Sequence, residues 1–216
     1  MGKVFDWIDN VFHVKKPHRR FLKRAILPDG LNYFYCLGGA AFTSYLLLLV
    51  TGLLLSMYYV PSEHEAFSSI VKIQREVHLG WFIRSVHKWS ATFIIVFILS
   101  HTLRVFISKA YSKPKELNWV IGALTLLFAF ASGFTGYLLP WDQKAYWATE
   151  VGTSMGGTVP LIGKHIVYLI RGGVDLNGAT LIRFYSMHVL WFPLCMSLLL
   201  WAHFHMIKRQ GIKVNL

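Results

Sequence analysis

The sequence predicts an all-α integral membrane protein built as a four-helix bundle. Of its 216 residues, 55% are hydrophobic and 15% are charged, whereas soluble domains usually carry about 25% charged residues. Four stretches reach the roughly 20 mostly apolar residues that a helix needs to cross a hydrocarbon core. We place these four spans at residues 33–59, 81–107, 119–139 and 180–207.

Two further segments lie outside the spans. Residues 1–32 are basic, and "VFDWIDNVF" has apolar residues at roughly helical spacing, so we expect an amphipathic arm on the membrane surface and no signal peptide. The connection between the third and fourth spans contains "WDQKAYWATEVG" and "PLIGKHIVYLIRGG". These stretches predict short helices within residues 141–172, inside a single membrane domain that covers residues 33–216.

The distribution of lysine and arginine predicts the orientation in the membrane. Fourteen of them lie in the arm, in or beside the connection between the second and third spans, or in the tail, and eight lie on the other face and its flanks. By the positive-inside rule, both termini face the negative side of the membrane (the n side), and the other two connections face the positive side (the p side). Topology therefore explains the net charge of +12 without a nucleic-acid partner.

Two spans each carry a pair of histidines. His87 and His101 are fourteen positions apart in the second span, and His188 and His203 are fifteen positions apart in the fourth. At about 100° and 1.5 Å per residue, the members of each pair lie within about 60° of one face and roughly 21–22 Å apart along the helix. Because both spans run from the p side to the n side, we expect His87 to face His188 and His101 to face His203.

Two interpretations of these histidines are open. A single histidine in a membrane helix is most simply a hydrogen-bonding residue between helices. Four histidines at two matched depths favour paired imidazoles that bind a flat macrocycle between two helices. Glycines repeat the spacing of fourteen positions in the other two spans, and they either allow close helix packing or leave room where a porphyrin approaches the backbone. These glycines are Gly38, Gly52, Gly122 and Gly136.

Eight stretches between residue 33 and about residue 212 carry a further signal. They are "FYCLGG", "EVHLGWFIRSVHKWSA", "HTLRVF", "KPKELNWVIG", "GFTGYLLPWDQKAYWA", "PLIGKHI", "TLIRFYSMH" and "HFHMIKRQGI". Together they resemble the cytochrome b family, and more narrowly its four-helix b6 type. The resemblance covers most of the chain and implies two non-covalent haem b groups in the bundle core.

The resemblance implies a ligand set for each haem. His87 and His188 match the axial ligands of the low-potential haem near the p side. His101 and His203 match those of the high-potential haem near the n side. Helix phase sets His205 aside, because it lies about 200° around the helix from His203.

Cationic partners for the haem propionates are also implied. Arg84 and Arg183 match arginines beside the p-side haem. Lys115 stands where the family often has an arginine on the n side, although snorkelling to the interface explains it equally well.

Cys36 matches the cysteine that holds a third haem in the b6 type, a haem c attached by a single thioether bond near the n side. Lys208 stands near the propionates of that haem, where the b6 type commonly has arginine. From the residues alone, Cys36 would be a small apolar side chain, because no CxxCH motif is present. Cys195 is expected to be a packing residue.

The resemblance implies a cytochrome b6-type subunit of a quinol:cytochrome c or plastocyanin oxidoreductase, active only within its complex. Quinol oxidation at the p side would send one electron to an iron–sulfur protein and the other through the haems to quinone at the n side, with Q-cycle proton translocation. Candidate residues of the p-side quinol pocket are Phe134, Ala148 and Val151. Aromatic residues there also suit an interfacial belt.

Implied partners are a second cytochrome b subunit resembling subunit IV, a Rieske iron–sulfur protein, a cytochrome c or cytochrome f-like acceptor, membrane lipid and a second copy of the complex. The basic arm favours a bacterial cell membrane and menaquinol over a thylakoid membrane and plastoquinol. Two other classes stay open. A dihaem cytochrome b anchor of a dehydrogenase or hydrogenase would lack "GYLLPWD", and a transporter with proton-relay histidines would lack a Soret band.

Overall fold

The computed structural model describes residue 7 and residues 36–211, so nearly all of the predicted arm lies outside the described residues. Within the described part the chain is helical and contains no strand. Four segments in that part are long and apolar enough to cross a membrane: α2 (Leu37–Ser56), α4 (Gly80–Ile107), α5 (Glu116–Leu138) and Gly178–Gln210. The predicted all-α, four-span membrane fold is confirmed.

The fourth span consists of three consecutive pieces. They are α8 (Gly178–Ser186), a π-helical turn η3 (Met187–Trp191) and α9 (Phe192–Gln210). This span and α5 extend two or three residues past the apolar runs, because their end turns contain polar residues such as Glu116 and Gln210. A count of apolar residues does not include such turns.

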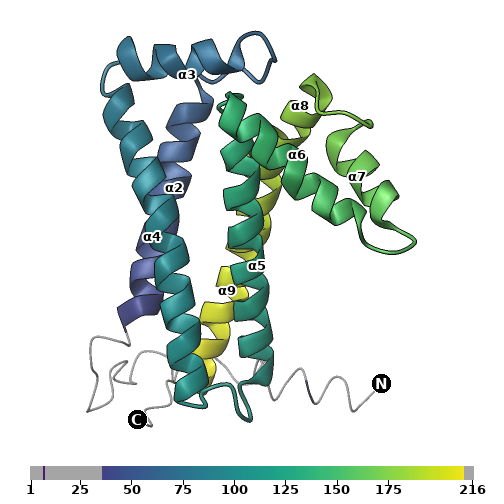
Figure 1. Cartoon of the computed structure of the whole chain (residues 1–216). Helices are drawn as coiled ribbons and strands as arrows, with labels where there is room; N and C mark the ends of the chain where they lie inside the picture. The colour runs from purple at the N-terminus through teal and green to yellow at the C-terminus, as the bar shows by residue number, and fades with distance from the viewer. Residues whose placement is uncertain (1–6, 8–35, 212–216) are drawn as a thin grey trace.

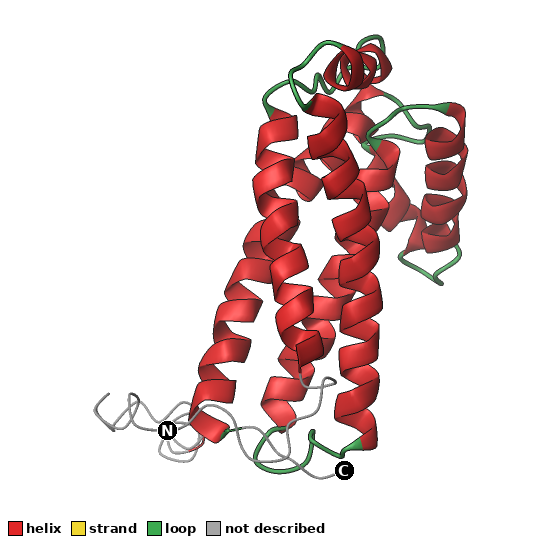
Figure 2. Cartoon of the chain, turned by 90° about the vertical axis from the view of Figure 1, so that its left-hand side faces the viewer, coloured by secondary structure: helices red, strands yellow, loops and turns green. Residues whose placement is uncertain are grey.

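The bundle is built from two antiparallel pairs of helices. α2 packs along α4, and α5 packs along α9 (Figure 1). The side view shows the spans running along a common direction (Figure 2). One buried residue from each span forms a layer at mid-height, which we call the central layer: Tyr45, Ile94, Ala129 and Met196.

The central layer contains one polar group, the hydroxyl of Tyr45. It donates a hydrogen bond to the carbonyl oxygen of Pro193 at 2.7 Å and lies 2.7 Å from the hydroxyl of Ser197. Because no water reaches the bilayer core, this pairing avoids the free energy of an unsatisfied hydroxyl. It also joins α2 to α9 across the two helix pairs.

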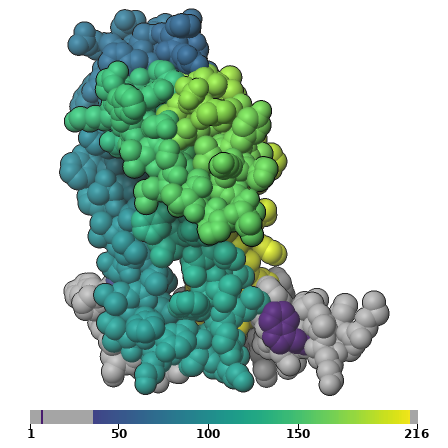
Figure 3. Space-filling view, turned by 45° about the vertical axis from the view of Figure 1, so that its right-hand side comes forward, coloured from purple at the N-terminus to yellow at the C-terminus, as the bar shows by residue number. Residues whose placement is uncertain are grey.

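The two ends of the bundle differ. α3 (Ala66–Arg75), α6 (Gln143–Gly157) and α7 (Gly163–Arg171) lie at the end that is drawn uppermost in Figure 1, which we call the upper end. The connection 108–115 joins α4 to α5 at the opposite, lower end. α6 and α7 cover only the upper part of the face seen in Figure 3.

Helix α3 was not predicted from the sequence. It is too short for a membrane span. Half of its residues are polar or charged, so the three buried positions, Ala66, Ser69 and Ile73, do not stand out in the sequence. Near it, Tyr59 donates a hydrogen bond to the carbonyl oxygen of Leu139 at 2.7 Å. Burial raises the pKa of the Tyr59 hydroxyl, so this donor keeps its proton.

Arg171 connects α6, α7 and the start of α8. It is 5% exposed, and it donates to the hydroxyl of Thr153 at 2.8 Å, to the carbonyl oxygen of Val174 at 2.9 Å and to the carboxylate of Glu150 at 3.0 Å. Its backbone carbonyl accepts from the hydroxyl of Thr180 at 2.7 Å. A buried guanidinium requires such acceptors because its donors have lost water.

We therefore predict that Arg171→Met loosens the upper end. The substitution leaves buried acceptors such as the hydroxyl of Thr153 without their donor, which costs about 1–3 kcal/mol, and the loss should appear as faster amide hydrogen exchange across residues 143–176. Lys164→Met removes an exposed cation from the same helix and should change this exchange little. Equal exchange in the two variants would show that Arg171 does not hold these helices together.

Candidate functional site

The four histidines lie inside the bundle as two facing pairs. His87 of α4 and His188 of η3 form the upper pair, with ring centroids 6.2 Å apart and ring planes at 73°. His101 of α4 and His203 of α9 form the lower pair, and both line one cavity. The structure thus brings together the same residues that the spacing pairs in the sequence.

Hydrogen bonds at Nδ1 orient both rings of the upper pair. The hydroxyl of Thr51 donates to the carbonyl oxygen of Leu47 at 2.6 Å, so at 2.8 Å it accepts from Nδ1 of His87. Nδ1 of His188 lies 2.8 Å from the carbonyl oxygen of Ser132, which can only accept. Both imidazoles therefore carry their proton on Nδ1, and each Nε2 keeps a lone pair.

The two histidines of the lower pair have different partners at Nδ1. Nδ1 of His203 lies 3.3 Å from the carbonyl oxygen of Asn118, which again assigns the proton to Nδ1. Nδ1 of His101 instead lies 3.4 Å from the guanidinium of Arg104, which can only donate. Metal binding through Nε2 would require His101 to move its proton to Nδ1 and to release this long contact.

Each histidine ring lies against a glycine of the neighbouring helix. A methyl group added to these glycines would approach the ring atoms closely: at Gly136 it would lie 2.5 Å from His188, at Gly38 3.2 Å from His101, at Gly52 3.2 Å from His87 and at Gly122 3.5 Å from His203. The sequence analysis expected room for helix packing or for a porphyrin. In the structure, the imidazole rings themselves occupy the space beside the missing side chains.

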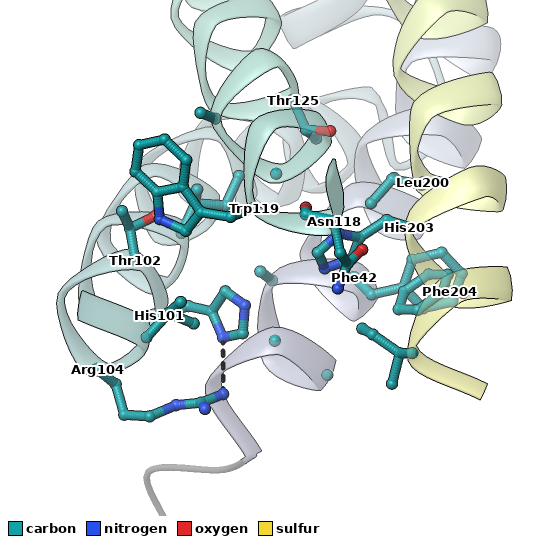
Figure 4. A pocket seen from close by; sticks show the side chains of 18 of the residues that line it. Phe42, His101, Thr102, Arg104, Asn118, Trp119, Thr125, Leu200, His203 and Phe204 are labelled. Atoms are coloured by element: carbon teal, nitrogen blue, oxygen red, sulfur yellow. Dashed lines mark hydrogen bonds between the residues drawn. The ribbon is translucent and has the colours of Figure 1, made fainter. Parts of the chain in front are cut away.

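The lower pair opens onto a cavity of about 280 Å³, close to the lower limit for pockets that bind organic ligands. His101 and Arg104 of α4 lie on one side of it, and His203 of α9 lies on another (Figure 4). Trp119 and Asn118 of α5 also line the cavity (Figure 4). Within the described residues, the buried Oδ1 of Asn118 has no hydrogen-bond partner.

The donor set fits haem iron. Metal–imidazole bonds of about 2.0–2.1 Å to two facing Nε2 atoms would set the ring centroids roughly 6 Å apart. The upper pair has this separation, 6.2 Å. The described part of the chain contains no group of three or more His, Cys, Asp or Glu side chains that could bind a bare metal ion. A facing pair of imidazoles would suit a metal whose other ligands come from a macrocycle.

The two arginines expected beside the upper pair precede their histidines by three positions (Arg84) and by five positions (Arg183). Arg84 donates to the side-chain oxygen of Gln74 in α3. Arg183 donates to the carbonyl oxygen of Ala179 at 3.4 Å, and its guanidinium lies against Gly172. Both side chains are therefore engaged with the upper-end helices in this structure.

Of the residues expected near the lower haems, one lines the cavity and two are exposed at helix ends. Lys115 lines the cavity and donates from Nζ to the carbonyl oxygen of Gly211 at 2.7 Å. Cys36 is exposed immediately before α2, and Lys208 is exposed in the last turn of α9. His205 lies beside Trp201, with ring centroids 5.8 Å apart, and does not line the cavity.

The residues expected in a quinol pocket meet at the junction of α5 and α6. Phe134 of α5 is 38% exposed, and its ring occupies the space where Gly152 of α6 has no side chain. It also lies 5.8 Å from the ring of Phe184. Ala148 and Val151 are exposed on α6. These residues form an open apolar surface at the upper end.

Sequence reasoning missed several residues of the site. Thr51 and Ser132 orient the upper rings, and Arg104 and Asn118 contact the lower ones. Arg104 follows His101 by three positions, which places it on the same helix face. That spacing was a usable signal, whereas the carbonyl groups of Ser132 and Asn118 act through the backbone and leave no trace in residue type.

Comparison with known proteins identifies the family. A family model described as cytochrome b/b6/petB matches residues 22–211. Proteins named cytochrome b6 from Gracilaria tenuistipitata var. liui and Stigeoclonium helveticum are 40% and 41% identical over 212 residues, 98% of this chain and 98% of each relative. A solved structure described as a hyperthermophilic respiratory complex III matches 96% of this chain with a TM-score of 0.84 at 30% identity, and this chain spans 55% of that one. The chain therefore belongs to the cytochrome b/b6 family.

Proposed function

We propose that this chain carries electrons across a membrane as the b6-type subunit of a quinol oxidoreductase. Two non-covalent haem b groups would be held by His87 with His188 and by His101 with His203. The observation that supports this most directly is the upper pair, whose rings face each other at 6.2 Å with both Nδ1 atoms occupied by acceptors. When bound, such haems take up and release single electrons.

The protein holds the two sites at different levels of the bundle. The histidines of α4 are fourteen positions apart, so the two levels are separated by roughly 21 Å across the bilayer. The central layer, with Tyr45 hydrogen-bonded to Pro193, fills the bundle between them. The hydrogen bonds that His87, His188 and His203 donate from Nδ1 fix the orientation of these three rings and raise the basicity of Nε2, the proposed ligating nitrogen.

The lower end is proposed to face the n side, because the sequence segments richest in lysine and arginine precede α2, connect α4 to α5 and follow α9, and these helix ends lie at the lower end. Quinol would be oxidised at the upper end, near Phe134, Ala148 and Val151, and a bacterial cell membrane is the proposed location. The respiratory complex III relative supports a respiratory assembly. Proposed partners are a second cytochrome b subunit, a Rieske protein, a cytochrome c or f-like acceptor and a second copy of the complex.

Replacement of a single ligand tests the two haem sites. His188→Leu and His203→Leu should each lower the content of haem b from two per chain to one, because one imidazole cannot supply both axial ligands. The pyridine haemochrome assay on the purified complex measures this content. His205→Leu is the matched control on the same helix and should retain both haems. Retention of two haems in either ligand variant would contradict the proposal.

Alanine substitutions at three glycines of α5 should disturb the haem sites to different degrees. Gly136→Ala should displace His188 and cost the upper haem, because its methyl group would lie 2.5 Å from the ring. Gly122→Ala should be mild, because a contact of 3.5 Å is ordinary. Gly133→Ala is the control, with no atom within 4 Å of the added methyl group. Redox-titrated optical spectra of the three variants give the occupancy, and equal spectra would refute this ranking.

A third, covalent haem at Cys36 is proposed from its exposed position immediately before α2. After acid–acetone extraction removes the haem b, one haem per chain should stay on the 24.8 kDa band of a denaturing gel. Cys36→Ala should abolish this stain and leave haem b unchanged, whereas Cys195→Ala should alter neither. A wild-type band without stain would reduce Cys36 to an ordinary side chain.

A further inference from the structure

The fourth span differs from the other three by one residue. The residues at the two levels of the site are fourteen positions apart in α2, α4 and α5, and fifteen positions apart in the fourth span. The pairs, from the first span to the fourth, are Gly38 and Gly52, His87 and His101, Gly122 and Gly136, and His188 and His203. On regular α-helices, a spacing of fourteen ends about 40° short of four turns, and a spacing of fifteen ends about 60° past them. The fourth span would therefore be out of phase by about 100°.

The structure nevertheless keeps all four spans in phase. Gly136 and Gly122 lie fourteen positions apart on the uninterrupted helix α5. Gly136 contacts His188, and Gly122 contacts His203. The two histidines therefore follow a repeat of fourteen positions in space, although the chain places them fifteen positions apart.

The central layer shows where the extra residue lies. In α2, α4 and α5, the residue of this layer is seven positions from the site residue on either side. In the fourth span, Met196 is seven positions before His203 but eight positions after His188. The additional residue is accommodated between His188 and Met196.

A π-helical turn occupies that interval. In η3 the amide of Phe192 donates to the carbonyl oxygen of Met187, five positions earlier. A π turn holds one residue more than an α turn. Pro193 follows directly, and because it has no amide hydrogen and its ring collides with the preceding turn, a regular α-helix is disfavoured there. The neighbouring side chains of Leu190 and Trp191 are both exposed, at 56% and 55%.

We propose that the π turn Met187–Trp191, set by Pro193, is a register device for the haem ligands. It absorbs one residue, so that His188 faces His87 while His203 stays level with His101. The proposal rests on the proposed function, in which these histidines are axial ligands. Pro193 is a positioning residue, because it acts through the helix backbone.

Two deletions of one residue test this directly in the assembled complex. Deleting Leu190 together with Pro193→Ala gives a regular helix with a spacing of fourteen, and it should retain two haem b per chain. Deleting Leu198 keeps the π turn and Pro193 but also gives a spacing of fourteen, so it should rotate His203 by about 100° and lose the lower haem. Haem content and redox-titrated spectra give the result. Loss of haem in the first variant with retention of both in the second would overturn the proposal.

A measurement on the native sequence guards against variants that do not assemble. A cryo-EM structure of the wild-type complex reads the turn directly. A π turn predicts that the amide of Phe192 donates to the carbonyl oxygen of Met187, five positions earlier. A hydrogen bond from this amide to the carbonyl oxygen of His188, four positions earlier, would overturn the proposal.

The two histidine variants test the proposed haem ligation separately from the role of the π turn. If His188→Leu and His203→Leu keep two haems, the proposed haem ligation fails. If they lose one haem each while both deletions behave alike, the ligation stands and only the register device is overturned.

Discussion

The packing of an imidazole ring against a glycine on the adjacent helix is the contact on which the bundle depends. At three of the four contacts a side chain on the neighbouring helix would crowd the ring, most closely at Gly136, where an added methyl group would lie 2.5 Å from His188; at Gly122 the corresponding distance of 3.5 Å is an ordinary contact. This requirement places α2 against α4 and α5 against α9. Because the glycines and histidines recur at matching intervals, both levels of the site form from the same pairing of helices.

Polar groups inside the bundle are arranged to support those rings. Thr51 satisfies its own hydroxyl on the preceding helical turn and still accepts from His87. Tyr45 uses the carbonyl oxygen of Pro193, next to the π turn. In a bilayer, an unsatisfied hydrogen-bonding group costs several kcal/mol, so these contacts favour one register of the helices over others. The outer faces carry apolar side chains such as Leu127 and Trp201, 62% and 68% exposed, which suit lipid.

The two ends of the molecule are built for different surroundings. The upper end has additional helices that are connected by the buried Arg171 and expose apolar side chains such as Val151 and Leu169. The lower end has a short connection and a cavity that combines histidine, arginine and lysine. The apolar surface of the upper end suits the proposed quinol site, and the cationic side chains of the lower cavity suit the propionates of the lower of the two proposed haems.

The sequence by itself determined the four membrane spans, the pairing of the histidines and the matching glycines, because hydropathy and helical phase depend only on residue type and spacing. It could not show that the extra residue between His188 and His203 is absorbed by a π turn. Nor could it identify the backbone acceptors of Ser132 and Asn118, or the contact of Arg104 with His101. These features were decided by tertiary structure, because they depend on how a neighbouring helix meets each ring.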